Sequence, residues 1–206
     1  MRYTGPKNRL ARREGMDLAL KTAGSKAQAR LLKKLNVAPG QHGSRGRRKV
    51  SDYGKQLREK QKLRYMFGLS AKQLKNYYTK AIKKPGNTAL FLAEYLERRL
   101  DNTVYRLGLA PTRACARQLI VHGHIKVDDR LMTVPSHQLE KGNVLSFAKP
   151  SSVKIPAVEK ALETKDVLLP AWLEKKAASG RMTGDPNGDF IEKQIKMRLV
   201  IEFFSR

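Results

Sequence analysis

The sequence predicts an α+β fold in which a helical domain is joined to a small domain with an antiparallel sheet. Three observations support this. Apolar residues recur at helical spacing between residues 51 and 120, short apolar runs at residues 125–134 flank a turn, and apolar residues step by four along 191–203. We expect residues 1–92, completed by 187–206, to form the helical domain. Residues 93–186 should form the second domain, in which a helix-turn-helix-like hairpin packs on the small antiparallel sheet.

Charge is distributed unevenly along the chain. The 206 residues hold 43 Lys and Arg against 18 Asp and Glu, a net charge of +25 with a pI near 10.4. Residues 1–92 carry 24 basic and 4 acidic side chains, whereas residues 93–206 carry 19 and 14. Because such a concentration of like charge opposes folding of the free chain, we expect a polyanion to neutralise the N-terminal half.

The sequence gives little support to a membrane, a metal ion, a cofactor or a small-molecule substrate as a partner. No apolar run reaches the roughly 18 residues that a membrane-spanning helix needs, and no secretory signal opens the chain. The single cysteine, Cys115, excludes an internal disulfide and a cysteine-cluster zinc site, and it is read as a small buried hydrophobe. The four histidines lack metal-ligand spacing with carboxylates. We therefore predict no membrane, no metal, no cofactor and no small-molecule substrate.

Residues 1–15 are predicted to form a basic arm that becomes ordered only on its partner. Residues 18–35 are helical in composition but show no clear apolar stripe. The glycines of the loop at residues 41–49 permit close approach to a phosphate, yet no phosphate-loop consensus is present, so nucleotide hydrolysis is unsupported. The candidate partner-binding residues of the arm and the loop are Arg2, Tyr3, Lys7, Arg9, Arg12, Arg13, Arg45, Arg47, Arg48 and Lys49.

Three helices are expected in residues 51–97. Ser51 is a suitable N-cap for the first, which Gly68 closes, and Ser70 is a suitable N-cap for the second. The third begins at Thr88. The apolar stripe of the second helix, which is more typical of a core than of a base-stacking surface, consists of Leu74, Tyr77, Tyr78 and Ala81.

The hairpin is expected in residues 96–123. Its first helix places apolar residues on one face and Arg98, Asn102 and Arg106 on another, which we expect to meet a partner. Gly108 ends this helix and Thr112 caps the second, which presents Arg113, Arg117 and Gln118. Arginines on the outer face of both helices suit bidentate phosphate binding. The plain alternative is a hairpin whose arginines are only solvated.

The remaining residues predict a small sheet and two more helices. Residues 125–134 should form a β-hairpin around the Asp128-Asp129 turn, and residues 144–147 a further strand. A short helix is expected at 157–165 and an exposed, turn-rich loop at 179–189. Ile191, Ile195, Leu199 and Phe203 predict one amphipathic C-terminal helix that packs on the N-terminal helices.

Residues 96–130 (LERRLDNTVYRLGLAPTRACARQLIVHGHIKVDDR) closely resemble an RNA-binding module. Small-subunit ribosomal protein S-four, several pseudouridine synthases and some tyrosyl-tRNA synthetases share it. The flanking sequences RYTGPKNRLARREG, APGQHGSRGRRKVSDYGKQLREKQKLRYMFG and IEKQIKMRLVIEFFSR resemble the bacterial S-four family, so the resemblance spans the chain. On matched positions it implies RNA contact at Arg98, Arg99, Arg106, Thr112, Arg113, Arg117, Gln118, His122 and His124, to which we add Lys126.

The resemblance implies a structural constituent of the small ribosomal subunit. Such a protein binds small-subunit ribosomal RNA at a junction in the 5′ domain and nucleates assembly of the subunit body. It also implies contact with ribosomal protein S-five, at an interface linked to translational accuracy. Arg45, Arg47 and Arg48 match a loop near the path by which messenger RNA enters. Because the N-terminal cysteines of some members are missing here, we expect the zinc-free form. The implied location is the cytoplasm, within the small subunit, and an organellar ribosome stays open.

Two other functions are compatible with parts of the sequence. An RNA-modifying or aminoacylating enzyme could carry the same module, but it would need a separate catalytic domain, and nothing of that size is left outside the module and its flanks. A DNA-binding repressor could use the helix-turn-helix-like hairpin, but a dimer interface is not evident and the basic, glycine-punctuated N-terminal half suits a large RNA better.

Overall fold

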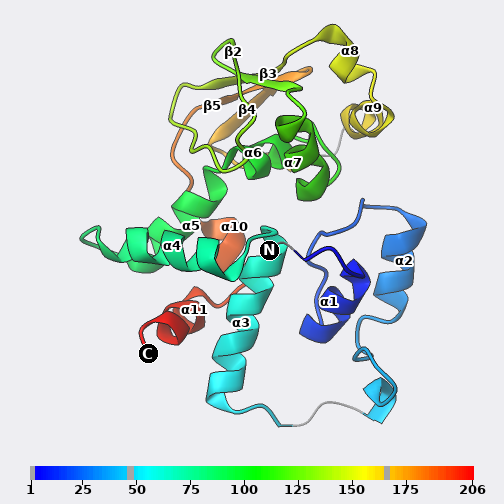
Figure 1. Cartoon of the computed structure of the whole chain (residues 1–206), viewed down its shortest axis with the longest axis vertical. Coiled ribbons are helices and arrows are strands. Elements are labelled where there is room, and N and C mark those ends of the chain that lie inside the picture. The colour runs from blue at the N-terminus through cyan, green and yellow to red at the C-terminus, as the bar shows by residue number, and fades with distance from the viewer. Residues whose placement is uncertain (1–2, 46–48, 165–167) are drawn as a thin grey trace. The chain divides into compact units, whose positions relative to one another are not determined.

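The α+β class predicted from the sequence is confirmed. The computed structural model describes residues 3–45, 49–164 and 168–206 (Figure 1). The chain divides into two compact units, residues 1–92 with 189–206 (unit 1) and residues 93–188 (unit 2). Unit 1 is helical, whereas unit 2 combines helices with a five-stranded antiparallel sheet. No helix among the described residues is long and apolar enough to cross a membrane.

The N-terminal arm is not an unstructured segment. Its residues form helix α1 (Lys7–Glu14), which packs with α2 (Lys26–Lys33). Leu10 and Ala11 of α1 are buried in one cluster with Leu18 and Leu31. The prediction of an arm that becomes ordered only on its partner is therefore wrong for these residues. Its few apolar side chains find partners that are distant in sequence, which the local pattern does not reveal.

The helix caps in residues 51–82 are confirmed. Helix α3 (Asp52–Met66) begins after Ser51, whose hydroxyl accepts a hydrogen bond from the Gly54 amide. Helix α4 (Ala71–Ile82) begins with a capping box between Ser70 and Gln73. Leu74, Tyr78 and Ala81 of its predicted stripe are buried, while Tyr77 is only half-buried. The basic loop before α3 includes a short 3-10 turn (Gly43–Arg45).

The prediction of a single C-terminal helix, made from the apolar residues spaced four apart along 191–203, is wrong. The structure has two helices, α10 (Asp189–Glu192) and α11 (Met197–Phe204), with a break between them. At the break the Lys196 amide donates to a carboxylate oxygen of Glu59 on α3 at 3.1 Å, so a tertiary contact starts the second helix. The expected packing on the N-terminal helices is confirmed, because α11 packs against α3 and α4 and Phe204 stacks on Tyr78.

Glu14, at the end of α1, makes unit 1 sensitive to pH. Its side chain is only 1% exposed, and Arg58 on α3 approaches it at 3.3 Å. Burial raises the pKa of Glu14 above the ordinary value of 4.5, although the Arg58 charge opposes that rise. The pKa of Glu14 is higher in the folded state than in the unfolded state. Its contribution to the free energy of unfolding is therefore complete below the unfolded-state pKa, and it is lost as the pH rises through the folded-state pKa.

Glu14→Gln is therefore expected to raise the Tm of unit 1 at neutral pH and to change it little below about pH 4, where the carboxyl is already protonated. Thermal unfolding followed by circular dichroism across this range tests it. The exposed Glu140→Gln variant makes the same charge change and serves as the control. A lower Tm for Glu14→Gln at neutral pH would show that the Arg58 contact outweighs the cost of burial.

In unit 2, helices α6 (Leu100–Arg106) and α7 (Arg113–Val121) pack against one face of the sheet (Figure 1). The sheet order is β2-β1-β3-β5-β4, with β1 (Ile125–Val127), β2 (Arg130–Leu131), β3 (Val144–Phe147), β4 (Leu173–Lys176) and β5 (Ser179–Met182). Asp128 and Asp129, with φ of 47° and 64°, form the predicted hairpin turn. Helices α8 (Pro150–Val153) and α9 (Pro156–Glu163) follow β3, so the predicted helix near 157–165 is confirmed.

The exposed loop predicted at residues 179–189 is wrong in its first part. Residues Ser179–Met182 form β5, which lies between β3 and β4 in the sheet. Gly180 and Met182 are buried. A Cβ added at Gly180 would lie 2.5 Å from both methyl groups of Leu107. The glycine that suggested a loop is thus a site where a strand approaches helix α6 closely.

Gly180→Ala is expected to destabilise unit 2 by about 1–3 kcal/mol, because the new methyl group forces buried Leu107 to move within a packed core. Chemical denaturation of both proteins measures the difference. Gly184→Ala is the matched control, since its Cβ would meet Trp172 at an ordinary 3.8 Å. Equal stability of the two variants would contradict the close packing of β5 on α6.

Candidate nucleic-acid interface

The hairpin of α6 and α7 begins at a break in the preceding helix. Helix α5 (Thr88–Glu97) stops because Arg99 is extended and forms an isolated β-bridge with Gln138. The Leu100 amide donates to the His137 carbonyl at 2.9 Å. Gly108 turns the chain with φ of 65°, and Thr112 caps α7 by accepting a hydrogen bond from the Cys115 amide, as predicted. Backbone contacts therefore hold the start of the hairpin.

Two carboxylates organise the arginines of the hairpin. Asp101 binds Arg99 bidentately at 3.0 and 2.7 Å and also accepts from Arg117 Nε at 3.0 Å. Glu97 accepts from Arg106 at 2.8 Å. An amide extends the second pair, since Asn102 donates to Glu97 Oε2 at 2.6 Å and accepts from Arg113 Nε at 2.9 Å. Four arginines and two carboxylates form this network, in which every one of these side chains except Arg117 is buried.

The prediction that the arginines of both helices lie on an outer face is therefore wrong for Arg106 and Arg113, and Arg99, for which the family resemblance implied RNA contact, is buried as well. Arg99 is 2% exposed, and Arg106 and Arg113 are each 6% exposed. Asn102, placed on the same face by sequence, is fully buried. The prediction assumed one continuous helix from residue 96 to 107, whereas the extended Arg99 interrupts that periodicity. The acidic partners then draw the guanidinium groups inward.

The network contains more positive than negative charge. Burial, followed by the charge of Arg106, lowers the pKa of Arg113 to about 10, so Arg113 stays charged at neutral pH. The Arg113 guanidinium lies over the Tyr105 ring at 4.5 Å, a cation–π contact that offsets part of the desolvation. With two carboxylates for four guanidinium groups, the hairpin retains a positive excess that attracts anions.

The surface of the hairpin is made by fewer of the predicted residues. The Arg117 side chain is 16% exposed, whereas Gln118 and His122 are exposed residues. His124 and Lys126 are half-buried, and His124 Nδ1 lies 3.0 Å from Ser152 Oγ. Arg98 is also half-buried and pairs with Glu94 at 2.8 Å and with Asp185. The accessible polar surface therefore centres on α7 and the turn that follows it.

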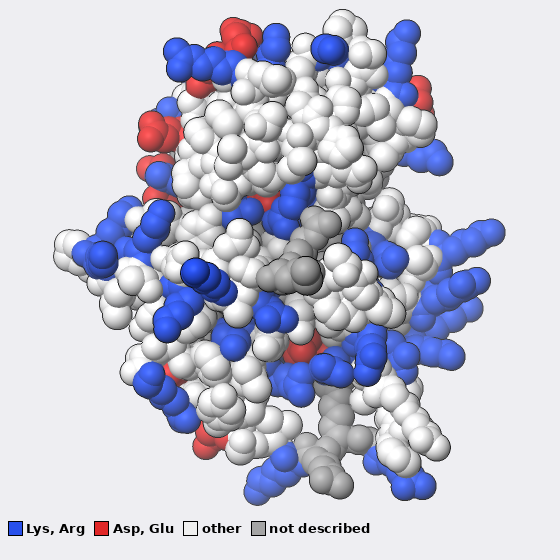
Figure 2. Space-filling view, viewed as in Figure 1, with Lys and Arg blue, Asp and Glu red and all other residues white. Residues whose placement is uncertain are grey.

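A second basic surface lies in unit 1. Arg9 and Arg13 of α1 are exposed, and the sequence analysis missed four exposed basic residues on or next to α2, namely Lys26, Arg30, Lys33 and Lys34. Figure 2 shows Lys and Arg side chains projecting over α2. None of these six forms an ion pair with another described residue. Of the two acids of residues 1–50, Glu14 pairs with Arg58, and Asp17 accepts hydrogen bonds from the Ala19 amide and from Gln28. The excess of basic over acidic residues in residues 1–50 was the signal that could have identified them from the sequence.

The other residues predicted in the N-terminal half have varied environments. Arg12 donates to the Val37 and Ala38 carbonyls at 3.0 and 3.1 Å, which ties α1 to the chain after α2. Lys7 is half-buried, and Tyr3 is exposed with its ring edge-on to Tyr65. Arg45 and Lys49 are exposed. Three predicted residues, Arg2, Arg47 and Arg48, lie outside the described part of the chain.

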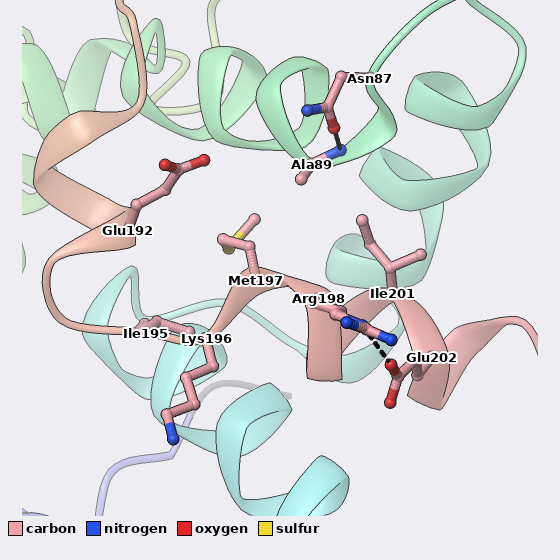
Figure 3. Close-up of a pocket in the computed structure, with 9 residues that line it drawn as sticks. All are labelled: Asn87, Ala89, Glu192, Ile195, Lys196, Met197, Arg198, Ile201 and Glu202. Carbon is pink, nitrogen blue, oxygen red and sulfur yellow. Dashed lines mark hydrogen bonds and ion pairs between the residues drawn. The ribbon is translucent and has the colours of Figure 1, made fainter.

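Unit 1 also contains a groove beside the C-terminal helix, with a volume of about 530 Å³ (Figure 3). Met197 and Ile201 of α11 contribute apolar surface to it. Charged residues of α10, α11 and the break between them surround this surface, and Arg198 pairs with Glu202 at 3.0 Å. Within residues 3–45, 49–164 and 168–206, no group of three or more His, Cys, Asp or Glu could hold a metal ion.

Comparison with known proteins assigns the chain to a family. Residues 2–97 match the model of the ribosomal protein S4/S9 N-terminal domain, and residues 98–145 match that of the S4 domain. The small ribosomal subunit protein uS4 of Chromobacterium violaceum is 41% identical over 207 residues, and that of Francisella tularensis subsp. novicida is 45% identical over 210. Both alignments cover 100% of this chain and 99% of the relative. The resemblance read from the sequence is confirmed: the chain belongs to the uS4 family of small ribosomal subunit proteins.

Proposed function

We propose that this chain binds small-subunit ribosomal RNA directly, at a junction in the 5′ domain, and nucleates assembly of the subunit body. The chain is a structural ribosomal protein, not an enzyme, as its family is structural. The observation that carries RNA binding is the set of six exposed basic side chains on α1, α2 and Lys34, without acidic partners among the described residues. A folded RNA is recognised largely by shape and backbone, which such a surface suits.

The hairpin supplies the second contact in this proposal. Arg117, Gln118 and His122 are polar residues on or just after α7 that reach the surface, and the positive excess of the network beneath them favours phosphate. We assign Arg99, Arg106 and Arg113 a role in shaping the hairpin, because their guanidinium groups are buried. Thr112 likewise acts as the cap of α7.

Contact with ribosomal protein S-five, with its effect on translational accuracy, is the second part of the proposal. The groove beside α11 supports it, since it combines apolar Met197 and Ile201 with a charged rim, as protein interfaces do. Ile201→Glu should weaken binding to purified S-five and leave binding to ribosomal RNA intact. Unchanged binding to S-five would remove the groove from the proposal.

Messenger RNA is the third proposed partner, at the basic loop with Arg45, Arg47 and Arg48. Arg45, the one of these three that lies within the described part of the chain, is exposed. The proposed location is the cytoplasm, within the small subunit.

The direct test of RNA binding is a salt-titrated assay of the full chain against the 5′ domain of its own small-subunit ribosomal RNA. A scrambled-junction RNA of equal length serves as the competitor. We expect tight binding that survives the competitor and falls with log salt at a slope of about −0.7 to −0.9 per phosphate contacted. Equal affinity for both RNAs would mean that the net charge of +25 acts only as a non-specific polycation.

A further inference from the structure

The imidazole ring of His124 contacts a buried serine in unit 2. Nδ1 of the ring lies 3.0 Å from Oγ of Ser152 on α8, and Ser152 is 2% exposed. The ring is half-buried and lies nearly parallel to that of exposed His122, at an interplanar angle of 15°. Nε2 of His124 has no hydrogen-bond partner among the described residues, and it is not one of their buried unpaired nitrogen atoms, so it reaches the surface.

Backbone hydrogen bonds fix both of these residues. The His124 amide donates to the Leu119 carbonyl of α7 at 2.9 Å, and the Ala148 amide donates to the His124 carbonyl at 2.9 Å. The Ser152 amide donates to the Lys149 carbonyl at 3.0 Å, and α8 packs against β3. The imidazole and the hydroxyl therefore meet on two segments whose backbones are held by other contacts.

The buried hydroxyl decides which ring nitrogen of His124 carries the hydrogen. A serine hydroxyl has one hydrogen to donate, and a buried donor without an acceptor costs free energy. Nδ1 of His124 is the one acceptor that the Ser152 hydroxyl has within the described part of the chain. In the neutral ring the Ser152 hydroxyl therefore donates to Nδ1, and the hydrogen of the ring lies on Nε2.

A ring nitrogen that carries a hydrogen and reaches the surface can donate to a phosphate oxygen. The surrounding elements offer it no competing carboxylate, because α7, β1, β3 and α8 contain neither Asp nor Glu. We propose that Ser152 is a positioning residue that fixes the ring of His124 with its hydrogen on Nε2, so that this N–H donates to a phosphate of the ribosomal RNA. The inference rests on the proposed function, because it takes the RNA as the ligand of His124.

A double-mutant cycle on the affinity of the full chain for the 5′-domain RNA tests this pairing. We expect Ser152→Ala to weaken binding by about twofold to tenfold, the fold-change that corresponds to one hydrogen bond. In the His124→Ala background, which should itself bind more weakly, it should have no further effect. Ser151→Ala is the matched control, because Ser151 is the exposed neighbour on the same helix, and it should leave the affinity unchanged. Additive losses, or an unchanged affinity of either Ser152→Ala or His124→Ala, would overturn the proposal.

Two neutral amides at position 124 separate the roles of the two ring nitrogens. Glutamine places its amide nitrogen near the position of Nε2, whereas asparagine places its amide nitrogen near that of Nδ1. We expect His124→Gln to retain more affinity than His124→Asn, because the glutamine amide still offers an N–H donor to the RNA. Equal affinity of the two variants, or tighter binding of His124→Asn, would overturn the assignment of Nε2–H as the contact.

The position of the hydrogen can be measured in the free chain by nuclear magnetic resonance. Nitrogen-15 shifts distinguish a ring nitrogen that carries a hydrogen from one that does not, and the chain has four histidines, so that each can be assigned by substitution. At about pH 8.5, where histidine side chains are ordinarily neutral, we expect the hydrogen on Nε2 of His124 in the wild-type chain and in Ser151→Ala. In Ser152→Ala the shifts of the two nitrogens should move toward each other, because the hydrogen exchanges between them.

The wild-type spectrum does not depend on whether Ser152→Ala folds. A hydrogen on Nδ1 of His124 in the wild-type chain, or unchanged shifts in a folded Ser152→Ala variant, would overturn the proposal. Failure of the proposed function looks different, because the wild-type chain would then fail to prefer the 5′-domain RNA over the scrambled competitor while the hydrogen remained on Nε2.

Discussion

Glu97→Ala is expected to lower the free energy of unfolding of unit 2 by about 3–5 kcal/mol, because it leaves a buried charge uncompensated. Glu97 is the acidic partner of Arg106, and its carboxylate also accepts from Asn102. A loss of this size is a large share of the roughly 5–15 kcal/mol that stabilises a typical domain. Urea denaturation followed by tryptophan fluorescence measures it, since the single tryptophan, Trp172, lies in the core of unit 2.

Two further variants separate this effect from others. Glu163→Ala removes an exposed carboxylate at the end of α9 in the same unit and should change stability by no more than about 0.5 kcal/mol. Glu97→Leu combined with Arg106→Met replaces the charged pair by apolar groups, so it should recover much of the loss. If the double variant were as unstable as Glu97→Ala, lost packing rather than an unpaired charge would be the cause.

Replacing Arg9, Arg13, Arg30 and Lys33 by alanine is expected to weaken RNA binding by roughly a hundredfold to a thousandfold at about 0.1 M salt. These exposed side chains of α1 and α2 have no ion-pair partner among the described residues, so we expect each to displace counterions from one phosphate. The slope of log affinity against log salt should become less steep by about 3. Filter binding over a range of salt concentrations provides both quantities.

The control for this prediction removes four basic residues from unit 2. Lys141, Lys154, Lys160 and Lys176 are exposed, and their replacement by alanine lowers the net charge by the same amount. We expect a much smaller change in slope, because these residues lie outside the proposed contact surface. Equal losses in the two variants would show that total charge, rather than the surface of α1 and α2, governs affinity. Circular dichroism spectra confirm that each variant is folded.

The sequence by itself determined the features whose physical cause is local. Ser51, Ser70 and Thr112 cap their helices because the backbone amide that each accepts from lies three residues along the chain. The Asp128-Asp129 turn follows from residues that tolerate positive φ between two short strands. The α+β class and the basic character of the N-terminal half likewise need only pattern and composition.

Only the tertiary structure decided which arginines face inward, where two helices break and which glycine lies in a strand. Arg99 becomes extended because Gln138, nearly forty residues away, bridges to it, and α11 begins where Glu59 of α3 accepts the Lys196 amide. Position 180 is a glycine because a Cβ there would lie too close to the side chain of Leu107. Each of these outcomes depends on a partner distant in sequence. Periodicity can assign a residue to a face of a helix, but the packing of the folded chain decides whether that helix continues and whether that face meets solvent.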